Sequence, residues 1–355
     1  MSLRSLLEKE AHWRLRNVLV LVFLLVLLPG FFAGTSVVFQ DVLPRDVPVA
    51  VAPADDSVDE SNLEVVEGTI ATFTEPTRVD DIQEGRAMLE RESVYAVVEV
   101  PANLDDASTE AEFRLVVDGA IVPFLSPSEI IGNVLESEMD RIFDAEVSAE
   151  REVVGEEKTL PEYLYPTFLL TLVIFFAFTY VPYNLKNESA VLDRLRVEAS
   201  MESVVAAKLL FFTALVTVPI VVFHAAALYY GYAVATLTPG AVLTLLLTFL
   251  LVSTVSSTIM ILSRFSGVGL FVNVTAMLGV VALSALAFPL GFFSPIRTTV
   301  AQLLPTYYAG VITRSTMLKG SSLTTFADWL ALLVGCLVVA AVALEGSIVY
   351  YRRSS

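Results

Sequence analysis

Cysteine, histidine and nucleotide-binding glycine loops are scarce or missing in this sequence. Its 355 residues include one cysteine, Cys336, which excludes an intrachain disulfide and any metal site built from several cysteines. With only His12 and His224, we find no Ser/His/Asp set for nucleophilic catalysis. No phosphate-binding loop of the GxxxxGK[ST] type occurs in the chain. We therefore predict a protein that is not an enzyme, binds no metal or cofactor of its own, and cannot hydrolyse ATP through such a loop.

Lysine is also rare, with 5 Lys against 17 Arg in a chain that has a net charge of −17. Residues 40–162 contain 31 acidic and 8 basic side chains, whereas the remainder contains 8 acidic and 14 basic ones. This asymmetry predicts an acidic water-soluble block and a slightly basic membrane block, with no nucleic-acid partner. An acidic, lysine-poor surface suits concentrated salt, which predicts a halophilic source. An ordinary acidic extracellular domain is the alternative.

Long apolar segments account for the 55% hydrophobic content and the mean hydropathy of +0.70. A helix that crosses a bilayer needs about 20 apolar residues. Six segments qualify: 17–39, 164–182, 208–232, 240–262, 268–290 and 329–351. The sequence therefore predicts an α-helical polytopic membrane protein with six transmembrane helices. For the first segment, a cleaved signal peptide is the alternative.

Basic residues in the short connections indicate the orientation of these helices. They lie in the N-terminal stub, in the loop after the second apolar segment, at Arg264, and in the tail at Arg352 and Arg353. With six spans, all of these positions fall on one side, which the positive-inside rule assigns to the cytoplasm. We therefore predict a multi-pass protein of the cytoplasmic (plasma) membrane with both termini in the cytoplasm and the acidic block outside.

The acidic block, residues 40–162, has the alternating strand and helix patterns of an extracytoplasmic α/β domain inserted between the first two membrane helices. We predict strands over 47–52, 68–75, 94–101 and 111–119, and helices over 79–93 and 126–147, the second capped by Ser126 or Ser128. The carboxylates between residues 55 and 60 lack the spacing of a calcium loop, so we interpret them as solvated surface. The other predicted parts are residues 1–39, an interfacial helix with the first span, and residues 163–355, a five-helix membrane domain.

The charged segment 183–207, on the predicted cytoplasmic side, has the pattern of an amphipathic helix. On a helical wheel, Glu188 lies with Val191, Leu192, Leu195 and Ala199, while charged residues occupy most of the remainder. The segment is also longer than a simple connection requires. It predicts a helix that rests on a membrane surface or docks on another protein, with a solvated connector as the alternative.

The order of these parts resembles that of the membrane subunits of ABC-2 type exporters. In that family the first cytoplasmic loop has an acidic start, a leucine pair, a small-residue element and a lysine that opens the next span. The matching residues here are Glu188, Leu192, Leu195, Ala199–Ser200 and Lys208, although Ala190–Val191 replaces a common Gly-Thr pair and Ala199 a proline. "VPVAVAPADDS" (47–57) and "LLPTYYAGVITRSTMLKG" (303–320) are also similar to family segments.

The resemblance implies a permease subunit that moves substrate outward, powered by a separate cytoplasmic ABC ATPase that binds the ATP. It implies that loop 183–207 carries the coupling helix, and that a second permease copy completes a homodimer or a heterodimer in the lipid membrane. The residues implied in docking are Glu188, Val191, Leu192, Arg194, Leu195, Arg196 and Glu198.

Polar residues inside the apolar segments are candidates for the transport path. His224 and Asn273 are the two we single out, because intramembrane polar side chains often face a bundle interior or a path. The run "STVSST" at 253–258 fits hydroxyls that bond their own helix better. Two other functions stay open: a membrane-anchored sensor or scaffold with an external ligand domain, and a secondary transporter that needs no ATPase.

Overall fold

The computed structural model divides the chain into two compact units. One unit comprises Met1–Val37, Leu164–Leu286 and Val300–Ser355, and the other comprises Val38–Tyr163 and Ala287–Thr299. We call the first the helical unit and the second the α/β domain. The structure describes residues 4–5, 8–9, 22, 25–26, 47–55, 57–72, 74–106, 108–143, 145–189, 200–290 and 295–354.

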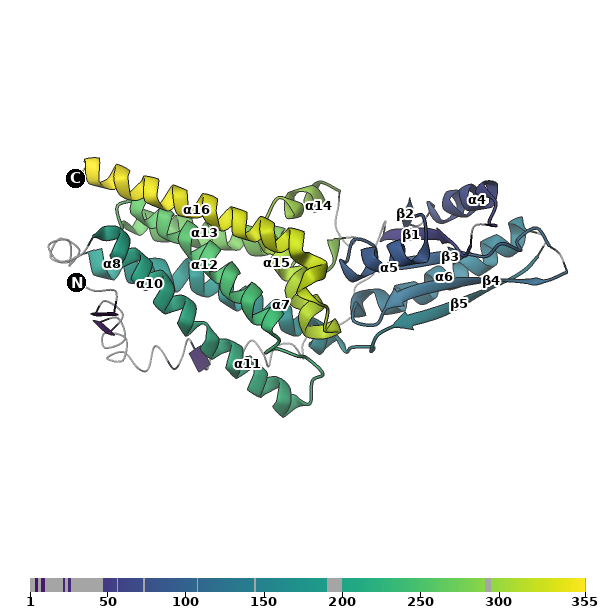
Figure 1. Ribbon diagram of the computed structural model, residues 1–355, viewed down its shortest axis with the longest axis horizontal. Helices are drawn as coiled ribbons and strands as arrows, with labels where there is room; N and C mark the ends of the chain where they lie inside the picture. Colours follow the sequence, from purple (N-terminus) through teal and green to yellow (C-terminus); the bar gives the residue numbers. More distant parts are fainter. Residues whose placement is uncertain are drawn as a thin grey trace. The chain divides into compact units, whose positions relative to one another are not determined.

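A five-stranded mixed sheet is the centre of the α/β domain (Figure 1). The strands are β1 (Val47–Pro53), β2 (Thr74–Arg78), β3 (Ala96–Val100), β4 (Glu110–Asp118) and β5 (Glu146–Val154). Their order is β2-β1-β3-β4-β5. The β1–β2, β1–β3 and β4–β5 pairs are parallel, and β3–β4 is antiparallel.

Helices cover both faces of this sheet, which makes the domain a three-layer α/β structure. The helices are α4 (Glu60–Ile70), α5 (Ile82–Glu90) and α6 (Val122–Ile142). Val49 and Val51 of β1 belong to the core shared with α4 and α6, whereas Ala50 and Ala52 belong to the core shared with α5. This alternation follows from the two-residue period of a strand.

Three sequence predictions for this domain need correction. The segment 68–75 is not a strand, because α4 continues through Ile70, whose buried side chain completes the core, and β2 begins only at Thr74. Helix α6 begins at Val122, without a side-chain cap, so Ser126 and Ser128 lie inside it. It ends at Ile142, and the residues that follow form β5, which the sequence analysis missed.

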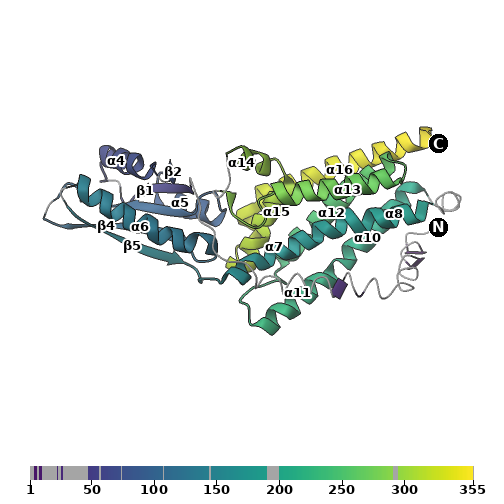
Figure 2. The same cartoon turned by 180° about the vertical axis from the view of Figure 1, so that it is seen from behind.

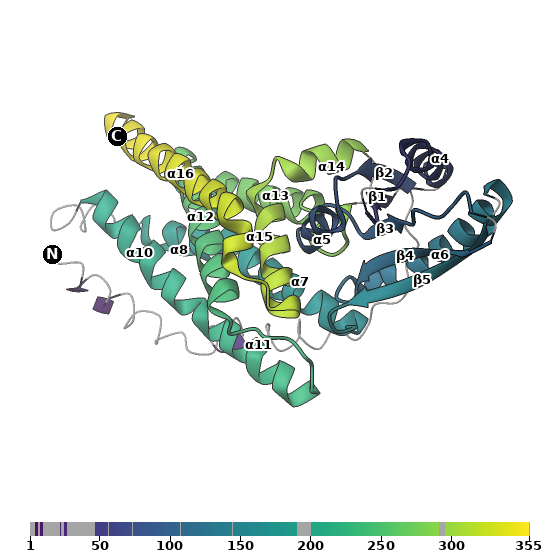
Figure 3. The same ribbon diagram turned by 45° about the vertical axis from the view of Figure 1, so that its right-hand side comes forward.

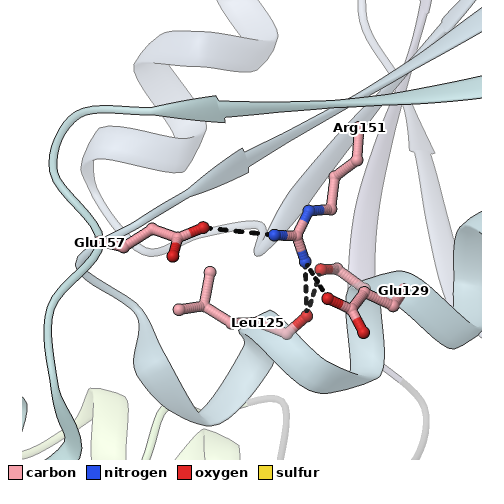
Figure 4. A network of polar contacts seen from close by, with 5 residues as sticks. Leu125, Glu129, Arg151 and Glu157 are labelled. Carbon is pink, nitrogen blue, oxygen red and sulfur yellow. Dashed lines mark hydrogen bonds and ion pairs between the residues drawn. The ribbon is translucent and has the colours of Figure 1, made fainter.

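Arg151 of β5 connects this edge strand to its surroundings (Figure 4). Its guanidinium pairs with Glu129 of α6 at 3.0 Å and with Glu157 beyond the strand at 3.3 Å. It also donates to the carbonyl oxygen of Leu125 at 3.2 Å. These contacts join β5, α6 and the chain that leaves the domain.

The helical unit consists of helices that run close together (Figure 2). The chain enters through α7 (Leu160–Phe175), and continues through the π-helix η3 (Phe176–Tyr180) into α8 (Val181–Ser189). The later elements of this unit are α10 (Met201–Leu215), α11 (Thr217–Tyr230), α12 (Pro239–Leu262), α13 (Gly267–Leu283), α15 (Pro305–Arg314), the π-helix η5 (Ser315–Lys319), the 3-10 helix η6 (Leu323–Phe326) and α16 (Ala327–Ser354). The boundary between the two units falls within α14 (Pro295–Gln302), after Thr299. Helix α12 contacts α8, α10, α13, α15 and α16, and Figure 3 shows it among them.

Four helical stretches in the described part of the chain are long and apolar enough to cross a membrane. They are Leu160–Ser189, Met201–Tyr230, Pro239–Leu262 and Leu323–Arg353, and they contain the predicted spans 164–182, 240–262 and 329–351 and most of 208–232. The predicted span 268–290 is a shorter apolar helix, because α13 ends at Leu283. Most of the predicted first span, 17–39, lies outside the described residues. The structure therefore supports a membrane protein with several spans, and the count of six stays a prediction.

Candidate functional site

Charged residues from several helices meet at one end of the helical unit. Arg352 near the end of α16 forms an ion pair with Glu202 at the start of α10. The ring of Phe265, in the turn between α12 and α13, packs on Tyr351 with centroids 5.6 Å apart. The end of α8 joins them, because Glu188 pairs with Lys208 of α10. We call this end, defined by the end of α8, the start of α10, the α12–α13 turn and the end of α16, the charged end.

A buried ion pair is the central contact of the charged end. The Nζ atom of Lys208 lies 2.6 Å from Oε2 of Glu188, and both side chains are only 1% exposed. The Nζ atom of Lys9 lies 3.4 Å from the other carboxylate oxygen, Oε1, and the Lys9 side chain is 28% exposed. One carboxylate is therefore shared by lysines from two distant parts of the sequence.

The position of Glu188 disfavours a negative charge, so its carboxylate needs the two lysines as partners. Glu188 is in the last turn of α8, where the negative end of the helix dipole disfavours an anion. Burial removes water that would otherwise stabilise its charge, and a buried charge persists only when it is paired. Glu188 and Lys208 thus depend on each other for their ionised forms.

Of the seven predicted docking residues, Glu188 alone is in the described part of the chain. Its carboxylate is held inside the protein by Lys208 rather than presented on a surface. The other six lie in 190–199, outside the described residues: Val191, Leu192, Arg194, Leu195, Arg196 and Glu198. Within the predicted loop 183–207, α8 continues to Ser189 and α10 begins at Met201, and residues 190–199 lie outside the described residues.

The two predicted path residues lie in different surroundings. His224 in α11 is partly buried, and its Nδ1 atom lies 2.9 Å from Oγ1 of Thr236. Asn273 in α13 is fully buried and donates to the carbonyl oxygens of Gly269 at 2.9 Å and Ser256 at 3.4 Å. Among the described residues, Oδ1 of Asn273 and Oγ of Ser256 are buried without a hydrogen-bond partner. None of these hydrogen bonds joins His224 to Asn273. Their role in a transport path stays a prediction.

Most hydroxyls of the run 253–258 bond their own helix, as the sequence analysis favoured. Ser253 and Thr254 donate to the carbonyl oxygen of Leu250, at 3.2 and 2.6 Å. Ser257 donates to Ser253 and Thr258 to Thr254 in the same manner. These bonds satisfy the hydroxyls within α12, so they give no reason to place them on a path.

A buried arginine is the polar feature that sequence reasoning missed. The side chain of Arg314, at the end of α15, is 2% exposed and donates to the carbonyl oxygen of Leu286 at 2.8 Å. Thr167 of α7 donates to the same oxygen at 2.6 Å. Arg314 therefore ties α15 and α7 to the chain just beyond α13. An arginine followed by "STML" within an apolar region was the available signal.

Carboxylates of the α/β domain are engaged with neighbouring side chains. Hydrogen bonds from the side chain and backbone of Ser57 hold the pKa of Asp55 below its usual range, and Ser108 does the same for Asp106. A hydrogen bond with Glu150 raises the pKa of Glu112. Among the described residues, no group of three or more potential ligands is placed to hold a metal ion.

Comparison with known proteins assigns the class of the molecule. The fold of the helical unit, with its apolar helices, is that of a multi-pass membrane protein. A sequence profile described as "ABC-2 family transporter protein" matches residues 15–344. The chain therefore belongs to the ABC-2 transporter family, as the resemblance predicted. Neither a curated protein nor a solved structure matched the chain in the same comparisons.

Removing the charge of Glu188 tests how much the buried pair stabilises the helical unit. We expect Glu188→Gln to lower the free energy of unfolding by about 3–5 kcal/mol, because Lys208 would be left as a buried charge without its ionised partner. The matched control is Glu202→Gln, which breaks the more exposed Arg352 pair and should cost at most about 1 kcal/mol. Denaturant unfolding of the purified full chain in detergent measures both. Equal costs for the two variants would contradict the importance of burial.

Proposed function

We propose that this protein is the membrane permease subunit of an ABC exporter that moves its substrate outward across the plasma membrane. Membership of the ABC-2 family over residues 15–344 is the observation that carries the proposal. The chain has no GxxxxGK[ST] loop, so the ATP would be bound and hydrolysed by a separate ATPase subunit. The permease itself would contribute the membrane passage and the surface on which the ATPase acts.

The ATPase would bind at the charged end. The helices α8 and α10, which enter and leave residues 190–199, both have their connecting ends there. In this proposal Arg194, Arg196 and Glu198 orient the ATPase, and Val191, Leu192 and Leu195 supply apolar contact. Closure of two ATPases around ATP would then shift a two-state equilibrium of two permease copies, in a homodimer or a heterodimer.

The basic residues at the charged end support an orientation with that end in the cytoplasm. Arg264, Arg352 and Arg353 are on this end, together with Lys208 and the contacts of Lys9. By the positive-inside rule both termini would be cytoplasmic and the α/β domain outside. The acidic surface of that domain would suit a halophilic setting.

The family assignment also bears on the two other candidate functions, a sensor or scaffold and a secondary transporter. A transporter family accounts for apolar helices beyond the single one that an anchored sensor or scaffold requires. A secondary transporter would need neither an ATPase nor a docking segment. The match to an ABC transporter family favours the ATPase-dependent function.

Charge reversal tests the ATPase-docking role. We expect Arg194→Glu or Arg196→Glu to weaken retention of the ATPase subunit about tenfold, which corresponds to a loss of about 1.4 kcal/mol where a like charge replaces an attraction. Arg141→Glu, an exposed position of α6 in the α/β domain, is the control and should retain the ATPase. Co-purification from membranes measures retention, and the amount of inserted permease should not change. Undiminished retention by both loop variants would exclude the docking role.

Site-directed labelling tests the orientation. Ser108 is exposed in the α/β domain, so Ser108→Cys in a Cys336→Ser background should react with a membrane-impermeant maleimide in intact cells. Arg353→Cys in the same background should react only in inverted vesicles. Labelling of Ser108→Cys solely from the inner side would overturn the proposed topology.

A further inference from the structure

The helices α8 and α10 enter and leave the proposed docking segment, yet they share few close contacts with each other. Each packs on α12 instead. Their direct contact near the charged end is the Glu188–Lys208 ion pair, one residue before the end of α8 and two helical turns into α10. Deeper in the unit, the ring of Tyr180 packs on Phe212 with centroids 5.5 Å apart.

The element directly before α8 is one about which that helix can bend. The π-helix η3 (Phe176–Tyr180) joins α7 to α8 and interrupts the regular hydrogen-bond ladder of the helix. Such π-helical turns are frequent at functional sites, and interruptions of the ladder are where helices bend. A tether at the far end of α8 would therefore decide whether α8 moves alone about η3 or together with its neighbours.

Glu188 has the properties of that tether. Its two carboxylate oxygens contact different lysines, Lys208 of α10 and Lys9 of the N-terminal segment. In surroundings from which water is excluded, separating opposite charges costs far more than it does in water. The pair therefore resists separation of α8 from α10 strongly, although it involves few atoms.

We infer that Glu188 is a positioning residue for transport: it holds α8, α10 and Lys9 together, so that a push on the docking segment moves the two helices as one body. The force that the ATPase exerts on the docking segment rests on the proposed function. The joint movement does not, because it follows from contacts within this chain alone. Without the ion pair, α8 would bend at η3 when the docking segment moves. The movement would then not be passed on to α12.

The distance between α8 and α10 tests this tether directly. Tyr183 and Leu210 are exposed by 52% and 50%, so cysteines at these positions in a Cys336→Ser background accept spin labels. Pulsed electron paramagnetic resonance on the full-length permease in nanodiscs should give one narrow distance distribution. Glu188→Gln should broaden or shift it, and the control Glu202→Gln should leave it unchanged. A distribution for Glu188→Gln with the same width and the same mean distance as the parent's would overturn the inference.

Two further variants separate positioning from loss of folding. Glu188→Gln with Lys208→Met removes both buried charges, so it should fold, yet it should give the same broad distribution. The charge-swapped variant, Glu188→Lys with Lys208→Glu and Lys9→Glu, should narrow the distribution again. If the double-neutral variant were as narrow as the parent, packing alone would hold the helices and the inference would be wrong.

ATP hydrolysis by the complex with its ATPase tests the consequence for transport. Per folded complex, the permease-dependent part of the hydrolysis rate should fall about tenfold in Glu188→Gln and recover in the charge-swapped variant, a typical size for coupling between sites. A lower melting temperature with an unchanged rate would show a purely structural role and would overturn the inference. If no ATPase co-purified, the proposed function would fail, while the distance measurement on the permease alone would still decide the tether.

Discussion

A carboxylate buried between two lysines is the constraint on which the charged end of the helical unit depends. Glu188 lies where its helix dipole disfavours it and where water cannot reach it, so its ionised form requires Lys208 at 2.6 Å. The same requirement brings α8 against α10 and attracts Lys9 from the N-terminal segment. Since α10 also pairs with α16 through Glu202 and Arg352, two separate sets of ion pairs hold α10 to its neighbours at this end.

The remainder of the helical unit is held together differently. Beyond the charged end, the polar contacts are mainly hydrogen bonds to backbone carbonyls, such as those from Thr167 and Arg314 to Leu286, and from Tyr165 to Phe223. The hydroxyl donors Thr167 and Tyr165 fix helices without an ionised group, whereas Arg314 does so with its charged guanidinium. The unit thus combines strong, charge-dependent contacts at one end with hydrogen bonds and packing elsewhere, which suits a protein that receives force at one end.

Sequence patterns predicted the elements that depend on residues close together in the chain, and they missed contacts between residues far apart. Local periodicity was sufficient for the strands at 47–52, 94–101 and 111–119, the helix within 79–93 and the four long apolar helices. It failed for β5, an edge strand whose side chains are largely polar and half-exposed, and for 68–70, where burial of Ile70 keeps the chain helical. The Glu188–Lys208 pair joins residues 20 positions apart, which no local pattern specifies. Its signals were the grouping of Glu188 with apolar residues on the helical wheel and the match of both residues to the first cytoplasmic loop of ABC-2 type exporters.

A structure of the permease bound to its ATPase, determined by electron cryomicroscopy with and without a non-hydrolysable ATP analogue, would test the central claim most directly. The account predicts the ATPase at the charged end, and a Lys208–Glu188 distance of about 3 Å in both states, with α8 and α10 displaced together. An ATPase bound elsewhere, or α8 moving while the pair is broken, would contradict it.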